Sequence, residues 1–448
     1  MKKNTAASQP VHYSSCRAKD YPGFEQTQDW QLGKPVNEGK GLRNHDALHQ
    51  AIQHTTRHKD WHWPVQPIIF LTDPHADAEA FVSSLEMSGA ITRSGSKHPR
   101  YTLTRTGQES KIIIGGDCLD KGPSNLKLLR SIRKLSNRGA QVSLLAGNHD
   151  IRLLMGLRAL TQDKETGDEH FLLRMSPKVI PLIKEVHDRY ILGHGRLSKI
   201  PGSKACKESL YPSERWFDEF PKHSSRLLSE LTIDKELRKM KKKTESFQSA
   251  CDDAGLCIRR AYAGINKCRE LFMSKSGEFS WFFRHMKLAH RDGSFLFVHA
   301  GLDDHVADLI KNKGVQHLNH EYRKRSRLDL SSFYYGSLAN MMRTKYRKSD
   351  APLTHGGVDK VHQQGIHAVL HGHRNRQMGQ RLMLRKGLFH FECDITMDRH
   401  SRKKEGLEGP GAGVTIVHPE GKVVGLSKDY PYAKVFEPHI HLSYKPRK

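Results

Sequence analysis

The sequence has few cysteines, no long apolar run and a shortage of acidic residues. It contains seven cysteines in 448 residues, and none forms a CxxC pair. An odd number without framework spacing is typical of reduced thiols, so we expect a cytoplasmic protein without disulfides. No stretch approaches the roughly 18 apolar residues of a membrane span. The basic N-terminal residues precede no apolar segment, so we expect no secretory signal.

The shortage of acidic residues makes the chain strongly basic. Lys and Arg number 74 against 48 Asp and Glu, a formal net charge of +26. Such a charge attracts polyanions such as nucleic acid, phosphorylated protein or acidic lipid surfaces. Because the basic residues are spread along the chain, they are equally consistent with a solvated surface that has no specific partner. Charge alone therefore leaves the partner open.

What the chain does have is five short apolar runs, each followed by residues that bind metal ions. The runs span residues 68–71, 111–114, 142–145, 295–298 and 368–370. Their continuous apolar character is typical of strands covered on both faces of a sheet. Open α/β sheets gather ligands beyond the carboxyl ends of their strands, so we expect one shared site. The motifs are Asp73-Pro74-His75, Gly116-Asp117-Cys118-Leu119-Asp120, Gly147-Asn148-His149-Asp150, His299-Ala300-Gly301 and His371-Gly372-His373.

Carboxylates in the first two motifs suit a pair of divalent ions. Asp73 and His75 are two residues apart, so one loop at a strand end can direct both at one ion. Two ions roughly 3.5–4 Å apart need a bridging carboxylate, and the Gly-Asp turn places Asp117 for that role. Asn148 offers a neutral oxygen. The imidazoles of His299 and His373 suit Mn, Fe, Ni or Zn better than Mg.

Other residues of the same motifs have roles beyond metal binding. His149 comes directly after the proposed ligand Asn148 but is not itself needed to bind the ions. We therefore interpret it as a general acid for the leaving group. Asp120 could orient that imidazole. Lys121 could bind phosphate oxygens as a point charge. His371 is interpreted as a structural or supporting residue.

The remaining sequence divides into three parts. Residues 1–65 are interpreted as a polar N-terminal extension, and residues 66–448 as one domain with a helical, basic insertion at about 160–290. Within the domain we expect helices at 76–87 and from Ser124 to Gly139. Residues 414–417 and 423–425 predict a terminal β-hairpin.

The order of these motifs resembles the calcineurin-like metallophosphoesterases, and most closely their phosphoprotein phosphatase branch, including bacterial members and the related diadenosine tetraphosphatases. The resemblance implies a four-layer α/β/β/α sandwich with two divalent ions, Mn being the most expected in vitro, at one edge. It implies that His149, paired with Asp120, protonates the leaving oxygen. It assigns one ion to Asp73, His75 and Asp117, and the other to Asp117, Asn148, His299 and His373.

The sequence also departs from that branch. Lys121 stands where the branch has Arg, which keeps the charge but loses the bidentate fork. Asn375 replaces the second His of a G-H-x-H motif, which argues against the phosphodiesterase branches. The branch carries a further phosphate-binding Arg between the last two His motifs, and Arg343 is the candidate.

The leading interpretation is a two-metal phosphatase that hydrolyses phosphomonoesters by a metal-bridging hydroxide, with phosphoserine or phosphothreonine proteins as substrates. One alternative is a hydrolase of diadenosine polyphosphates or nucleotides. Another is a nucleic-acid-binding protein that uses the fold as a scaffold, suggested by the net charge of +26. The complete ligand set speaks against a scaffold without activity.

Overall fold

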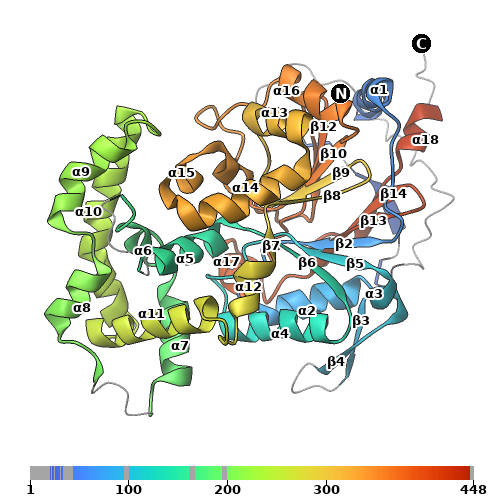
Figure 1. Cartoon of the computed structure of the whole chain (residues 1–448). Coiled ribbons are helices and arrows are strands. Elements are labelled where there is room, and N and C mark those ends of the chain that lie inside the picture. Colours follow the sequence, from blue (N-terminus) through green and yellow to red (C-terminus); the bar gives the residue numbers. More distant parts are fainter. Residues whose placement is uncertain are drawn as a thin grey trace, which may run out of the picture.

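The computed structural model describes residues 21, 23–24, 26–30, 32–33, 44–94, 100–160, 167–193 and 199–443. Two β-sheets lie face to face at the centre, and helices cover their outer faces (Figure 1). The helices α2 (Ala78–Met87) and α4 (Asn125–Asn137) lie on one side. On the other side lie α13 (Asp304–Lys313), α14 (Val315–Leu328) and α16 (His355–Gln363). The expected four-layer α/β/β/α fold is therefore confirmed.

The first sheet has eight strands in the order β1-β15-β14-β13-β2-β5-β6-β7. Strands β2, β5, β6 and β7 run parallel, so their carboxyl ends meet at one edge. The expected hairpin at the C-terminal end is present as β13 and β14. The bounds are β1 Gln26–Asp29, β2 Ile68–Leu71, β5 Lys111–Ile114, β6 Gln141–Leu145, β7 Met286–Lys287, β13 Gly413–His418, β14 Lys422–Ser427 and β15 Tyr432–Phe436.

The second sheet has five strands in the order β11-β12-β10-β9-β8. Here β10 runs parallel to both β9 and β12. The five apolar runs are thus confirmed as strands, three in the first sheet and two in the second. The bounds are β8 Ala289–Asp292, β9 Phe295–Val298, β10 Ala368–His371, β11 Arg381–Arg385 and β12 Leu388–Glu392.

Alternation along the strands explains how both sheet faces are covered. Ile68 and Phe70 of β2 lie in the apolar cluster between the sheets, together with Phe297 of β9. Their neighbours Ile69 and Leu71 belong to the cluster that includes the apolar faces of α2 and α4. Successive side chains of a strand point to opposite faces, so a continuous apolar run fills both layers of the core.

The two helices expected near the site begin at side-chain caps. Oδ1 of Asp77 accepts a hydrogen bond from the backbone N of Ala80 at 3.1 Å, so α2 begins two residues later than the expected 76. Oγ of Ser124 accepts from the backbone N of Lys127 at 3.1 Å and caps α4. Such caps satisfy amides that a helix leaves without a partner in its first turn.

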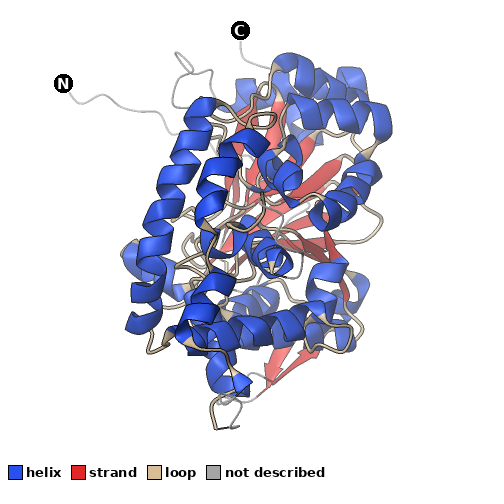
Figure 2. Cartoon of the chain, turned by 60° about the vertical axis from the view of Figure 1, so that its left-hand side comes forward, coloured by secondary structure: helices blue, strands red, loops and turns tan. Residues whose placement is uncertain are grey.

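The segment expected as an insertion is helical and stands beside the sandwich, where long helices come forward in Figure 2. Within its basic run, Lys239 pairs with Glu236, and Lys243 donates to the backbone oxygen of Ser176. Lys241 and Lys242 are exposed. The helices are α6 Phe171–Arg174, α7 Ile180–Tyr190, α8 Ser203–Leu210, α9 Glu214–Ser224, α10 Glu230–Asp253, α11 Ile258–Met273 and α12 Ser280–His285.

The polar N-terminal segment contributes to the sandwich where it is described. Strand β1 extends the first sheet by pairing with β15, and helix α1 (Asn44–His58) packs against α16 and α18 (Pro438–Ser443). Trp30, Leu48 and Ile52 are buried in the cluster between the sheets. Six cysteines are free thiols, as expected, and Cys16 lies outside the described residues. Within the described ranges, we find no helix with the length and apolar character needed to cross a bilayer.

Candidate metal centre

The predicted site residues come from the ends of five strands in both sheets. Asp73 and His75 follow β2, and Asp117 follows β5. Asn148 and His149 follow β6 and open helix α5 (Asn148–Ala159). His299 and His373 follow β9 and β10 of the second sheet. The site therefore spans the edge where the two sheets meet.

The loops at this edge hold several residues in the left-handed backbone conformation. Non-glycine residues rarely adopt it, because each costs on the order of 1–3 kcal/mol, and such residues concentrate at functional sites. The φ angles are +56° at Asp73, +38° at His75, +53° at Asp117, +69° at Asp120, +66° at Lys121 and +65° at His373.

Two glycines allow the loops to approach closely. A Cβ atom on Gly372 would lie 1.9 Å from Oδ2 of Asp73. A Cβ atom on Gly147 would lie 2.0 Å from the backbone N of Asp117 and 2.3 Å from its Oδ1. Any other residue would push a carboxylate out of place, which explains why glycine precedes His373 and Asn148.

Asp73, His75 and Asp117 form one group whose ligand atoms lie within 4.8 Å of one another. Nε2 of His75 lies 3.7 Å from Oδ1 of Asp73 and 3.7 Å from Oδ2 of Asp117. The other oxygen of Asp73, Oδ2, accepts hydrogen bonds from Oγ1 of Thr72 at 2.7 Å and from the backbone N of His373 at 3.0 Å. These bonds hold the carboxylate with its Oδ1 toward the group.

Asp117, His299 and His373 form a second group within the same 4.8 Å limit. Nε2 of His299 lies 3.4 Å from Oδ2 of Asp117. Of the two terminal atoms of the Asn148 side-chain amide, the one that faces the group lies 3.2 Å from Nε2 of His299, 3.0 Å from Nδ1 of His373 and 3.3 Å from Oδ2 of Asp117. Asp117 thus belongs to both groups, and Asn148 lies inside the second.

The imidazoles of the two groups are oriented by backbone carbonyls. In each ring one nitrogen donates to a carbonyl, so the other nitrogen is directed toward the ligand groups. This fixes the tautomer, as the supporting contacts of metal-binding histidines do. The acceptors are the carbonyl oxygens of Leu119 for His75 at 3.2 Å, Gly115 for His299 at 2.8 Å and Arg343 for His373 at 3.1 Å.

His149 differs, because a carboxylate orients it in place of a carbonyl. Its Nδ1 lies 2.9 Å from Oδ2 of Asp120. Its backbone N donates to Oδ1 of Asp117 at 2.8 Å, and its Nε2 lies 3.9 Å from Oδ2 of the same residue. Burial holds the pKa of His149 well below its usual range, and nearby His75 lowers it further. The ring is therefore neutral in this state and lies beside both groups.

Each group already holds one positive charge. Burial alone would lower the pKa of His299, but Asp117 and Asp73 raise it to about 10, so this ring is protonated. Nζ of Lys121 lies 2.7 Å from Nε2 of His75, the nitrogen that faces the first group. The carboxylates therefore stabilise positive charge in both ligand groups.

Arg343, the candidate phosphate-binding residue, lies in a buried basic cluster. Its guanidinium lies 5.0 Å from the ring centroid of Tyr334. Burial would raise the pKa of Tyr334, but Arg174, Arg152 and Arg343 lower it to about 7. The lowered pKa of Tyr334 reflects the strongly positive environment of its ring. One of these arginines, Arg174, comes from the helical insertion.

Several residues of the site were not predicted from the sequence. Both carboxylate oxygens of Asp150 bind loop amides: Oδ1 accepts from Cys118 N at 3.0 Å and Oδ2 from Gly147 N at 3.2 Å. Burial and Asp117 raise the pKa of Asp120 to about 8, and Arg152 and Lys178 oppose this rise. Asp150 adjoins a predicted motif, whereas no local pattern marks Lys178.

Two further residues of the last motif lie outside both groups. His371 is fully buried, and its Nδ1 lies 3.0 Å from the carbonyl oxygen of Gly372. Burial lowers its pKa to about 3. Asn375 is exposed and donates to Oε1 of Glu405 at 3.0 Å, pointing away from the site.

Comparison with known proteins agrees with this geometry. Residues 66–243 match the family model described as calcineurin-like phosphoesterase, a range that contains Asp73, His75, Asp117, Asn148 and His149. This part of the chain is thus similar to calcineurin-like phosphoesterases, which supports a metal-dependent phosphoester hydrolase. His299 and His373 lie beyond the matched range. A comparison with curated proteins gave no match.

Solved structures that match this chain include phosphatases. A cold-active protein tyrosine phosphatase is 12% identical, with a TM-score of 0.44, over 91% of this chain and 88% of that chain. A structure of the cold-active protein-tyrosine phosphatase of a psychrophile, Shewanella sp., is 12% identical, with a TM-score of 0.43, over 92% and 91%. A protein serine/threonine phosphatase from Saccharomyces cerevisiae is 11% identical, with a TM-score of 0.36, over 89% and 91%.

Proposed function

We propose that this protein is a two-metal phosphatase that hydrolyses phosphomonoesters, with phosphoserine or phosphothreonine in proteins as the substrate. The observation that carries the proposal is the sharing of Asp117 between two ligand groups. A carboxylate between two divalent ions neutralises charge on both, which is the arrangement of two-metal hydrolytic sites.

The donor set fits two divalent transition ions. Asp73, His75 and Asp117 would hold one ion, and Asp117, Asn148, His299 and His373 the other. Mixed carboxylate, amide and imidazole donors suit Mn, Fe, Zn or Ni, and we propose Mn for assays. When bound, such ions supply Lewis acidity toward phosphoryl oxygens and a nucleophilic water at neutral pH.

The protein side chains would bind and protonate the substrate. In its protonated form, His149, oriented by Asp120, would give a proton from Nε2 to the leaving oxygen. Lys121 and Arg343 would bind phosphoryl oxygens. Lys121 now lies against His75, so it must release that contact when the first ion binds. Its ammonium then becomes available to the substrate phosphate, as a single charge without the fork of arginine.

The basic cluster at Arg343 supports a phosphorylated macromolecule as substrate. Arg174 and Lys243 come from the insertion, and Arg174 lies with its guanidinium 4.8 Å from the ring centroid of Tyr334. A positive wall beside the site attracts a phosphorylated segment and its acidic neighbours. A small-molecule phosphomonoester would need fewer of these charges than a phosphorylated protein segment.

A substrate panel with added Mn tests the proposal. We expect turnover of phosphoserine and phosphothreonine peptides, weaker turnover of diadenosine polyphosphates and nucleotides, and loss of turnover in Asp117→Asn. Preferred cleavage of the dinucleotides would replace the proposal with the nucleotide hydrolase. Binding of nucleic acid that falls steeply with salt, without hydrolysis of any phosphoester, would favour the scaffold.

A further inference from the structure

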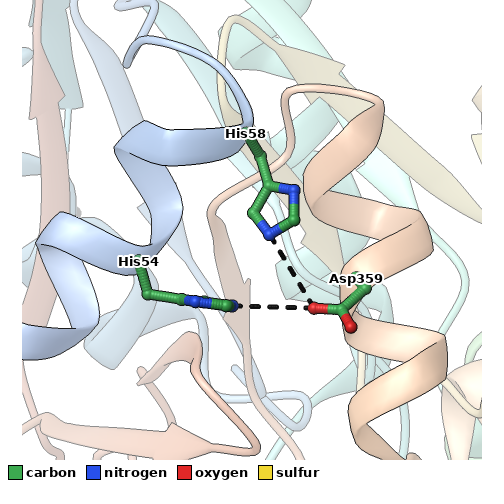
Figure 3. Close-up of side chains that lie close together, drawn as sticks. All are labelled: His54, His58 and Asp359. Carbon is green, nitrogen blue, oxygen red and sulfur yellow. Dashed lines mark ion pairs between the residues drawn. The ribbon is translucent and has the colours of Figure 1, made fainter.

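A second cluster of metal-ligating side chains lies on the outside of the molecule, apart from the centre described above. His54 and His58 belong to α1, and Asp359 belongs to α16. Their ligand atoms all lie within 4.8 Å of one another. Figure 3 shows both imidazoles directed at the same carboxylate across the gap between the two helices.

The distances in this cluster are too long for hydrogen bonds. Nε2 of His54 lies 3.6 Å from Oδ1 of Asp359, and Nε2 of His58 lies 3.8 Å from the same oxygen. Hydrogen bonds between nitrogen and oxygen measure about 2.7–3.2 Å. Ligands of a tetrahedral zinc ion, with bonds near 2.0–2.2 Å, are about 3.3–3.5 Å apart. The distances from Asp359 to the two imidazole nitrogens are thus close to those between ligands of one ion.

The spacing along α1 explains how two ligands come together. Residues four apart lie on the same helix face, one turn above the other. His54 and His58 therefore present both imidazoles to α16, which supplies the carboxylate. The side chains of His54 and Asp359 are each 45% exposed, and that of His58 is 23% exposed. An ion could enter from solvent and keep water at its open position.

Among the residues that the structure describes, no lysine or arginine forms an ion pair with Asp359. The imidazole of His362 stacks on that of His58, with ring centroids 5.6 Å apart. Burial and His367 lower the pKa of His362 to about 4, so this ring is neutral. Lys360, next to Asp359 in the chain, pairs with Asp308 at 2.7 Å. The carboxylate is therefore available to a metal ion.

We propose that His54, His58 and Asp359 bind one divalent transition ion, with Zn²⁺ as the best match to two imidazoles and one carboxylate. The ion would link the N-terminal helix α1 to α16 of the outer layer. Its role is structural, because it fastens α1 to a helix of the layer that covers the second sheet.

Zinc content tests this site independently of activity. The full chain, His54→Ala/His58→Ala, Asp359→Asn and the control His317→Ala/His320→Ala are dialysed against Zn²⁺, and bound metal is counted. The control removes a stacked pair on α14 that, in the part of the chain the structure describes, belongs to no ligand group of three. We expect wild type and control to hold one more Zn²⁺ per chain than either site variant.

Titration with Zn²⁺ provides a second measurement. Asp359→Asn preserves the shape of the side chain. We expect it to weaken the binding of Zn²⁺ to the site at His54 and His58 by at least about 100-fold. Hydrolysis of p-nitrophenyl phosphate with Mn is expected to be equal in all four proteins, which shows that the catalytic centre is intact. Equal zinc content and equal titrations in all four proteins would overturn the site.

Discussion

Nδ1 of His149 lies 2.9 Å from Oδ2 of Asp120, and both side chains are buried beside the two ligand groups. The three other imidazoles of the centre donate to backbone carbonyls. A backbone carbonyl carries no net charge, whereas an ionised carboxylate can also stabilise an imidazolium through its charge. This difference in partner separates the proposed acid from the proposed ligands, although all four residues are histidines.

Replacing Asp120 by Asn should reduce turnover mainly for substrates with poor leaving groups. Without the carboxylate, His149 keeps its place but loses the partner that supports its proton. We expect kcat to fall about 10²-fold or more with an alkyl phosphate. A much smaller fall is expected with p-nitrophenyl phosphate, whose leaving group needs little protonation. An equal fall for both substrates would contradict a role in proton transfer.

Replacing Asp117 by Asn should remove metal binding from both groups together. One residue serves both, so the variant is expected to lose both Mn equivalents and at least about 10³-fold in kcat, since the ions supply several kcal/mol of charge stabilisation. Metal analysis and p-nitrophenyl phosphate hydrolysis measure the two effects. The matched control is Asn375→Ala, because this exposed residue points toward Glu405 and should leave both unchanged.

Gly372→Ala should disturb the site through a steric contact. The added Cβ would lie 1.9 Å from Oδ2 of Asp73, so the carboxylate or the loop must move. We expect a stability loss of about 1–3 kcal/mol in urea unfolding and a large fall in kcat. Gly202→Ala is the control, because nothing lies within 4 Å of its added Cβ and its φ is −63°. A fully active Gly372→Ala variant would show that the loops are more adaptable than this contact implies.

Lys121→Met should change metal and phosphate affinity in opposite directions. The lysine ammonium lies 2.7 Å from Nε2 of His75, where it competes with the first ion, so its removal should strengthen Mn binding. The same removal should raise KM for a phosphopeptide about 10-fold, because one phosphate contact is lost. Mn titration and steady-state kinetics separate the two effects. Lys127→Met, on the exposed face of α4, is the control.

Acid stability should depend on a buried carboxylate away from the centre. The side chain of Glu392 is fully buried and accepts from Arg381 at 2.8 Å and Arg385 at 2.7 Å. Burial would raise its pKa, but His371 and the surrounding arginines lower it to about 2. A lowered pKa contributes stability above the ordinary value near 4.5, and that contribution is lost as pH falls toward 2.

Urea unfolding at pH 7 and at pH 3 measures this dependence. The pKa difference corresponds to on the order of 3 kcal/mol at pH 7. Glu392→Gln should therefore have a lower free energy of unfolding than wild type at pH 7. The difference in this free energy between the two proteins should narrow at pH 3. A gap that stays constant over this range would show that Glu392 titrates normally.

The centre was largely predictable from short segments of sequence, because the information is local. An apolar run that ends in Asp-x-His or Gly-Asn-His marks both a strand and the residues at its end. Asp73, Asp117 and Asn148 follow three strands that are adjacent and parallel in the first sheet. The ends of these strands therefore meet at one edge, whatever the rest of the chain does. The resemblance added Arg343, which no local pattern distinguishes from its basic neighbours.

Other features depend on contacts between distant segments. The polar composition of α1 predicted an extension, yet Leu48 and Ile52 reach the core between the sheets. Burial raises the pKa of Asp120 to about 8, and Lys178, far along the chain, opposes this rise. Leu48, Ile52 and Lys178 belong to no motif. Their effects depend on the elements that pack beside them in the folded chain.

The sequence by itself determined the strands, the ligand types and the class of chemistry, because strand periodicity and donor identity are properties of neighbouring residues. Only the tertiary structure decided which atoms face one another. It brought Gly372 against Asp73, gave His149 a carboxylate partner, and placed His54 and His58 opposite Asp359. Such pairings depend on how the two sheets and their covering helices pack, since that packing alone joins residues far apart in the chain.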